Sequence, residues 1–335
     1  MHATIRWQST SLVSMADMFG SNLFISIHVT IGIFLISLEN TYEPQSPRSC
    51  LLLQTSSGCQ FRNIKRVDDM FARMKHSRVL VLNEIKFSKF PDSITHLKHR
   101  RYLSLTNIDI TELSDAIGNL YHLQTLESTC YKKKFELSYW SWNFHLIFVT
   151  GADCVEYPEG IAKLTELQTV SYFNDHQHQG SAKLGELRDL NNIKGSLVIR
   201  VINQLTDVQE AKMACLEKKR KIQTLTLEGD IRGGPTPIDS DVLESLKPRP
   251  KLENLYIFMG TSPSSWLGHP SFSKLEKIEL EGCQNWASLP PLGQLPSLIY
   301  LSIQSAKSTV KSIGHEFFSG GFPQLRTLQL KDMEN

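Results

Sequence analysis

Three short stretches of the sequence hold side chains whose types and spacing suggest metal or nucleic-acid chemistry. Asp175, His176 and His178 offer three metal ligands within four residues. A structural zinc site has four ligands, and no distant Cys or His pair completes this set, so we expect a solvated loop and no metal. The runs 217–221 (Glu-Lys-Lys-Arg-Lys) and 132–134 (Lys-Lys-Lys) could contact nucleic acid. We interpret both as solvated polar faces, the first on a helix that precedes a strand.

Catalytic motifs are absent from the sequence. It contains no Gly-x-Ser-x-Gly, His-Glu-x-x-His or Gly-x-Gly-x-x-Gly, which mark hydrolases, metalloproteases and dinucleotide sites. The six cysteines form no Cys-x-x-Cys pair, so we expect reduced and mostly buried thiols. Cys283 is predicted to make a buried turn contact. We therefore predict no catalytic residue, no cofactor and no enzyme activity.

The charge balance bears on the kind of partner. Lys plus Arg total 36 and Asp plus Glu total 34 in 335 residues, a formal net charge of +2. Phosphate binding usually requires a clear basic excess, so we expect no nucleic-acid partner. A hydrophobic content of 41% and a charged content of 21% are typical of an ordinary folded chain.

An apolar stretch at residues 23–38 raises the question of a membrane. Its sixteen residues carry no formal charge, but a spanning helix needs about 20 apolar residues. Arg6 alone supplies the basic region that a secretory signal would need. The chain has no Asn-x-Ser/Thr sequon, which favours an intracellular location. We expect no membrane partner, and a membrane-anchored or secreted receptor-like protein stays the alternative.

The elements that position the candidate binding residues come from an internal repeat. The pattern Leu-x-x-Leu-x-Leu recurs in phase, with apolar substitutes, and a looser copy ends at 196–199. Its copies start at Ser77, Arg100, Leu123, Leu167, Ile222, Leu252, Leu275, Leu298 and Leu325. The first three starts are 23 and 23 residues apart, and the last four are 23, 23 and 27 apart. A period in the twenties with this core is the leucine-rich-repeat signature.

The spacing predicts an α/β leucine-rich-repeat solenoid, or horseshoe. In x-Leu-x-Leu both leucines point to one face of a short strand, and neighbouring repeats bury them together. Each repeat therefore gives one parallel strand on the concave side and a helical or irregular convex segment. The residues between the leucines face outward, and we predict that they bind protein, with Tyr256 and Tyr300 as anchors. This predicted surface comprises Glu253, Asn254, Tyr256, Glu276, Lys277, Glu279, Tyr300, Ser302, Arg326 and Gln329.

The connecting segments differ along the chain. The segments near residues 90–97, 113–120 and 157–164 share apolar-(Pro or Ser)-x-x-Ile-x-x-Leu, which predicts the first turn of a short helix. Ser-Leu-Pro-Pro-Leu-Gly-Gln-Leu-Pro-Ser-Leu at 288–298 has three prolines, which favours extended backbone. Trp266 and Trp286 are expected to pack in such segments. Arg100 takes a leucine position, where a buried charge is costly unless it is paired.

The repeat loses its phase once. The starts at Leu123 and Leu167 are 44 residues apart, and the text between them lacks the leucine pattern. The interval holds a degenerate repeat, an insertion or non-native coding sequence. A bulged loop there is expected to pack the aromatic side chains of Trp140, Trp142 and Phe144 against other residues. The predicted organisation is a leader at 1–44, a lead-in at 45–76 and the repeats at 77–335, with an irregular insertion at about 131–156.

The region from about Ser77 to Met333 resembles the leucine-rich-repeat region of plant nucleotide-binding leucine-rich-repeat immune receptors of the coiled-coil type. Specific text includes LGELRDLNNIKGSL at 184–197, LPPLGQLPSL at 289–298 and IGHEFF at 313–318. The resemblance implies a non-catalytic cytoplasmic module that recognises a pathogen effector or a guarded host protein in the defense response. It also implies a contact with the family's nucleotide-binding module as a further partner.

The family's nucleotide-binding module needs Gly-x4-Gly-Lys-Ser/Thr, and the sequence has no such string. We therefore expect a truncated receptor that lacks this module. A non-functional receptor gene fragment is the other alternative.

Overall fold

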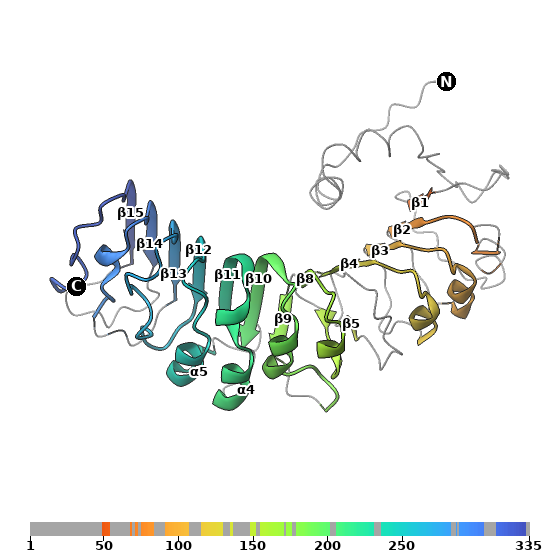
Figure 1. Cartoon of the computed structure of the whole chain (residues 1–335), viewed down its shortest axis with the longest axis horizontal. Coiled ribbons are helices and arrows are strands. Elements are labelled where there is room, and N and C mark those ends of the chain that lie inside the picture. Colours follow the sequence, from red (N-terminus) through yellow and green to blue (C-terminus); the bar gives the residue numbers. More distant parts are fainter. Residues whose placement is uncertain are drawn as a thin grey trace, which may run out of the picture.

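The computed structural model describes residues 49–53, 68, 71–72, 75–83, 91–106, 115–129, 135–136, 148–151, 155–170, 172–175, 179–201, 206–230, 236–282, 286, 288–304 and 313–332. Over these residues the chain forms an arc, with strands along its concave side and short helices along its convex side (Figure 1). The predicted α/β solenoid is confirmed. The leader at 1–44 and its apolar stretch 23–38 lie outside the described residues.

Two parallel sheets follow each other along the arc. The first has the spatial order β1 (Ser49–Leu53), β2 (Val79–Asn83), β3 (Tyr102–Thr106), β4 (Thr125–Thr129), β6 (Phe148–Gly151) and β8 (Thr169–Val170). The second has the order β9 (Tyr172–Asp175), β10 (Lys194–Val201), β11 (Lys221–Gly229), β12 (Asn254–Phe258), β13 (Lys277–Glu281), β14 (Tyr300–Gln304) and β15 (Thr327–Lys331). β8 closes the first sheet and β9 opens the second, so the arc continues across the junction.

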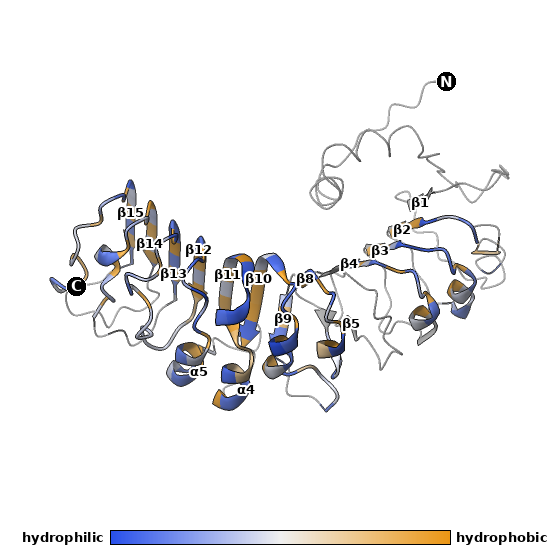
Figure 2. Cartoon of the chain, viewed as in Figure 1, coloured by the Kyte–Doolittle hydropathy of each residue, from blue (hydrophilic) through white to orange (hydrophobic). Residues whose placement is uncertain are grey.

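The strands stack in a strict register that follows the repeat. Leu255 of β12 lies opposite Ile278 of β13, which lies opposite Leu301 of β14. All three side chains are fully buried. Along the strands of the second sheet, apolar and hydrophilic residues alternate (Figure 2). One row of side chains thus enters the core while the next faces the concave side.

The convex segments are single helical turns. Most are 3-10 turns, namely η1 (Asp92–His96), η2 (Asp115–Asn119), η3 (Ile161–Lys163), η4 (Leu184–Asp189), η5 (Leu216–Lys218) and η6 (Leu292–Gln294). Two are α-helical, namely α4 (Val208–Met213) and α5 (Ser240–Ser245). The turns predicted near residues 90–97, 113–120 and 157–164 are η1, η2 and η3. The proline-rich stretch 288–298 holds the three-residue turn η6, so its backbone is less extended than predicted.

Carboxylates tie successive convex turns together. The Glu186 carboxylate accepts hydrogen bonds from the amides of Gly160 and Ala162 in the preceding repeat, at 2.8 and 3.1 Å. Glu210 does the same for the amide of Gly185, at 3.0 Å. Amides at the start of a helical turn have no partner within the turn, so these acidic side chains satisfy them from the next repeat.

The buried Arg100 is paired, as its position required. Its Nη1 donates to Ser77 Oγ at 2.5 Å and to the Val79 carbonyl at 2.7 Å. Trp266 and Trp286 are buried in connecting segments, as expected. Their indole nitrogens donate to the Leu243 and Gly260 carbonyls, at 3.3 and 3.2 Å.

The stretch where the phase is lost contributes strands. β6 pairs with β4 on one side and β8 on the other, so it fills the slot of a repeat strand. β5 (Phe135–Glu136) and β7 (Val155–Glu156) form a separate two-stranded pair. One strand of the interval thus belongs to the first sheet. Trp140, Trp142 and Phe144 lie outside the described residues, as do Lys132–Lys134.

In the described part of the chain, no helix has the length and apolar character needed to cross a membrane.

The last strand leaves its core row open. Leu328 and Leu330 of β15 continue the buried rows of β14, yet they are 41% and 37% exposed. Leucine thus occupies a fully packed position in β14 (Leu301) and a partly exposed position in β15 (Leu328).

We expect Leu301→Ala to lower the free energy of unfolding by about 2–5 kcal/mol, because it empties a fully packed position. The matched change Leu328→Ala, at the open end, should cost less than about 1 kcal/mol. Urea unfolding followed by circular dichroism measures both. Equal losses for the two variants would contradict the observed difference in packing.

Candidate protein-binding face

The outward rows of the second sheet contain most of the predicted binding residues. Seven lie at outward positions within strands, namely Asn254 and Tyr256 in β12, Lys277 and Glu279 in β13, Tyr300 and Ser302 in β14, and Gln329 in β15. The other three, Glu253, Glu276 and Arg326, lie one residue before their strands. All ten are at least partly exposed, so the fold brings the set onto one surface.

A lysine between two tyrosines occupies the centre of this surface. Lys277 Nζ lies 5.3 Å from the centroid of the Tyr256 ring and 4.8 Å from that of Tyr300. It also forms an ion pair with Glu279 at 2.8 Å. These contacts raise the pKa of Lys277, chiefly through the hydrogen bond to Glu279. The ammonium contacts both rings, and this attraction restrains them before any partner arrives.

Polar contacts fix the neighbours of this cluster. The Tyr300 hydroxyl lies 3.3 Å from Gln329 Oε1, and Asn254 Nδ2 donates to Thr224 Oγ1 at 3.1 Å. Each contact joins adjacent strands. The surface therefore spans β11 to β15 as one connected array.

A further outward row was missed by the sequence-based prediction. Phe258 ends β12, with Glu228 of β11 opposite on one side and Glu281 of β13 on the other. Arg200 of β10 bonds to Glu228 at 2.6 Å and lies 5.7 Å from the Tyr172 ring centroid. The signal was available, because each of Phe258 and Glu281 stands one residue after the last apolar position of its repeat.

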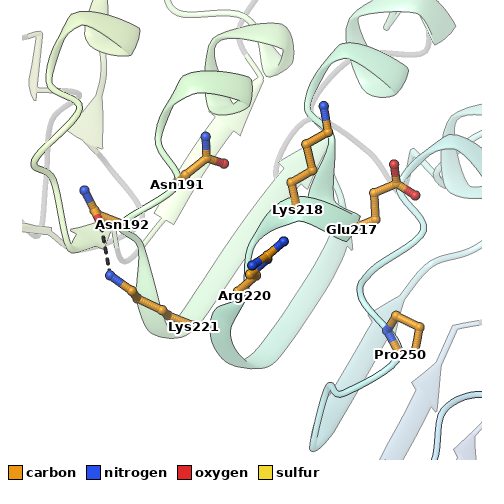
Figure 3. Close-up of a pocket in the computed structure, with 7 residues that line it drawn as sticks. All are labelled: Asn191, Asn192, Glu217, Lys218, Arg220, Lys221 and Pro250. Atoms are coloured by element: carbon orange, nitrogen blue, oxygen red, sulfur yellow. Dashed lines mark hydrogen bonds between the residues drawn. The ribbon is translucent and has the colours of Figure 1, made fainter.

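A polar depression on the molecule is a second candidate site. It has a volume of about 640 Å³ and is lined by Asn191, Asn192, Glu217, Lys218, Arg220, Lys221 and Pro250 (Figure 3). Lys221 Nζ donates to Asn192 Oδ1 at 2.9 Å across two repeats. The basic run of the sequence thus lies at the wall of this depression, with most of its side chains exposed.

Lys219 departs from the predicted solvated face. Its side chain is only 1% exposed. Its Nζ donates to the carbonyls of Leu187 and Arg188, the latter at 3.1 Å, and to Asn191 Oδ1 at 3.0 Å. Burial lowers the pKa of Lys219 from 10.5 to about 8. The run is therefore solvated except for one lysine that caps the end of η4 in the preceding repeat.

Asp175 also differs from the prediction of a solvated loop. It ends β9, is 4% exposed, and accepts a hydrogen bond from Thr206 Oγ1 at 2.6 Å. Burial raises its pKa. His176 and His178 lie outside the described residues, and so does Cys283. Within the described ranges, no group of three His, Cys, Asp or Glu could hold a metal ion.

The stacked parallel strands and the convex turns define a leucine-rich-repeat solenoid with a continuous outward array on its concave side. Residues 184–306 match the family described as R13L1/DRL21 leucine-rich repeats.

Similar curated proteins share the repeat region. The chain is 34% identical over 180 residues to the putative disease resistance protein RGA1 of Solanum bulbocastanum, covering 53% of this chain and 18% of that protein. It is 34% identical over 165 residues to the putative disease resistance protein At3g14460 of Arabidopsis thaliana, covering 46% and 11%. The matched part therefore spans less than a fifth of the length of these relatives.

A leucine-rich-repeat protein of Leptospira interrogans is a similar solved structure. It has a TM-score of 0.45 and 15% identity, and the match covers 93% of this chain and 87% of that one.

Lys219→Met removes the buried ammonium and leaves the Leu187 and Arg188 carbonyls without this donor. We expect the free energy of unfolding near neutral pH to fall by about 1–3 kcal/mol. The pKa of Lys219 is about 8 in the folded chain against a usual 10.5, so between these pH values the unfolded chain binds more protons. The stability of the wild type should therefore rise relative to the variant as the pH increases through this window.

Urea unfolding at several pH values measures both effects. The control is Lys221→Met, which changes an exposed lysine two residues away and should alter stability by less than about 0.5 kcal/mol, with no such pH slope. A wild-type advantage over Lys219→Met that does not change across the window would show that Lys219 titrates normally.

Proposed function

We propose that the chain is a non-catalytic protein-binding module of a plant disease-resistance protein, and that its concave face recognises a pathogen effector or a guarded host protein. The observation that carries this proposal is the ordered cluster of Tyr256, Lys277 and Tyr300 at the centre of the outward array. Relatives named disease resistance proteins support the biological setting.

A few large side chains supply much of the binding energy of a protein interface. Tyrosine offers a large apolar ring and one hydroxyl at a low cost in side-chain entropy, and it is common among residues that dominate binding energy. Here the Lys277 ammonium already restrains both rings, which lowers the ordering cost on association. The parallel strands keep the surface rigid between repeats.

Location and whole-protein architecture are part of the same proposal. A cytoplasmic location would expose the face to effectors inside the plant cell. The relatives are much longer than the matched region, so we propose that in the whole receptor these repeats also contact a nucleotide-binding module. That contact would use a surface other than the tyrosine cluster.

The double variant Tyr256→Ala/Tyr300→Ala tests the proposed face. A partner is first captured by a photoreactive amino acid placed at Ser302, beside the cluster, and its affinity is then measured by calorimetry. Loss of both rings should weaken binding at least about thirtyfold, the equivalent of 2 kcal/mol for a dominant contact.

The matched control is Tyr121→Ala. Tyr121 is 61% exposed and lies outside the outward rows of the second sheet, so its loss should change the affinity less than twofold. Unchanged affinity of every captured partner for the double variant would reject this face as the binding surface. Equal effects of the control and the double variant would do the same.

A further inference from the structure

The centre of the concave face joins aromatic rings to carboxylates. On β12 the outward residues Tyr256 and Phe258 follow one another, and both are partly exposed. In register beside them on β13 are Glu279, opposite Tyr256, and Glu281, opposite Phe258. We call Glu253, Tyr256, Phe258, Glu276, Glu279 and Glu281 the aromatic–acidic face.

Its formal charge is opposite in sign to that of the whole chain. Four carboxylates, those of Glu253, Glu276, Glu279 and Glu281, and the one ammonium of Lys277 sum to a formal charge of −3, while the chain carries +2. On the neighbouring strand β11, Glu228 is paired with Arg200 at 2.6 Å, so this ion pair adds no net charge beside Phe258. A surface of one sign raises the local concentration of ions of the other sign, and this favours a cationic partner.

The position of each carboxylate on the face decides whether it can contact that partner. Glu279 is engaged with Lys277 at 2.8 Å. Glu253 and Glu276 stand before the strands, where Glu276 is exposed and Glu253 has only long contacts with the Gln223 amide, at 3.4 and 3.5 Å. Among the described residues, neither Glu253 nor Glu276 forms an ion pair, so both charges are available to a partner.

The first sheet shows the contrast. There Tyr102 is 3% exposed and its hydroxyl donates to Glu127 of the next strand. The residues before β3 and β2 are Arg101 and Arg78, both exposed, at the positions that Glu276 and Glu253 take in the second sheet. Exposed rings beside carboxylates are thus a property of β12 and β13, not of every repeat.

We propose that the aromatic–acidic face binds a basic, arginine-containing segment of the protein partner. This inference rests on the proposed protein-binding function and specifies the chemistry of the ligand. A guanidinium stacks on an aromatic ring and donates two parallel hydrogen bonds to a carboxylate. Lysine makes the same charge contact without the planar fork, so arginine fits this combination better.

The probe for the test is a labelled peptide of alternating arginine and glycine, with lysine–glycine and glutamate–glycine peptides of the same length beside it. Fluorescence anisotropy with the full chain measures binding at low salt and again at about 1 M salt, where the screening length is about 3 Å. The arginine peptide should bind several times more tightly than the lysine peptide, and the glutamate peptide should not bind. High salt should weaken binding but leave the preference for arginine.

Two sets of variants locate the site. Glu253→Gln/Glu276→Gln removes two exposed charges and should weaken the arginine peptide about three- to tenfold at low salt. Phe258→Ala should weaken it about threefold at both salt concentrations, because it removes a stacking surface. The control Glu159→Gln/Glu166→Gln makes the same charge change at exposed residues outside this face and should have less than a twofold effect.

The outcomes separate this inference from the proposed function. Equal weakening by the control pair, or equal binding of the glutamate peptide, overturns the inference. If a captured partner still depends on Tyr256 and Tyr300 but is unaffected by Glu253→Gln/Glu276→Gln, the concave face binds protein and the basic-segment proposal is wrong. If the partner depends on neither pair, both proposals fail.

Discussion

Stacking of each repeat's apolar row on the next is the constraint on which the molecule depends. A five-residue strand such as β12 or β13 cannot bury its own two inward side chains, and it is stable only between neighbours. Leu255, Ile278 and Leu301 show the completed state, with no exposed surface. At β15 the same row lacks a neighbour on one side in the described chain, and Leu328 and Leu330 are exposed. The stability of a repeat is therefore a property of its interfaces.

Polar side chains also join successive repeats, in addition to the stacked apolar row. The single turns of the convex side are too short to satisfy their own ends, so groups from adjacent repeats do so. Glu186 and Glu210 accept from amides at the start of a turn, while Lys219 donates to carbonyls at the end of one. Arg100 plays a comparable part on the strand side by bonding to Ser77 and Val79 of the preceding repeat. A charge in such a position links two repeats through the hydrogen bonds that it makes to the neighbouring one.

This rigid scaffold leaves the outward residues free to vary in chemistry. Because the strands are in register, residues from different repeats form continuous rows on one surface. The cluster of Tyr256, Lys277 and Tyr300 draws on three strands that are 23 residues apart in sequence. A concave surface of this kind combines short contributions from distant segments, which suits recognition of an extended protein surface.

The amino-acid sequence by itself determined the repeat architecture, because one repeat cannot bury its leucine row alone and a stack of repeats of fixed period can. It also determined which residues face outward, since side chains alternate strictly along a strand. The same alternation also places Phe258 and Glu281 outward, although the prediction did not extend past the last apolar position of each repeat. Only the tertiary structure decided that Lys219 and Asp175 are buried, because their partners lie some 30 residues away at Leu187, Asn191 and Thr206. It alone also decided that Lys277 lies between two tyrosine rings, since the lateral spacing of strands, and not the sequence order, brings an ammonium and a π-system together.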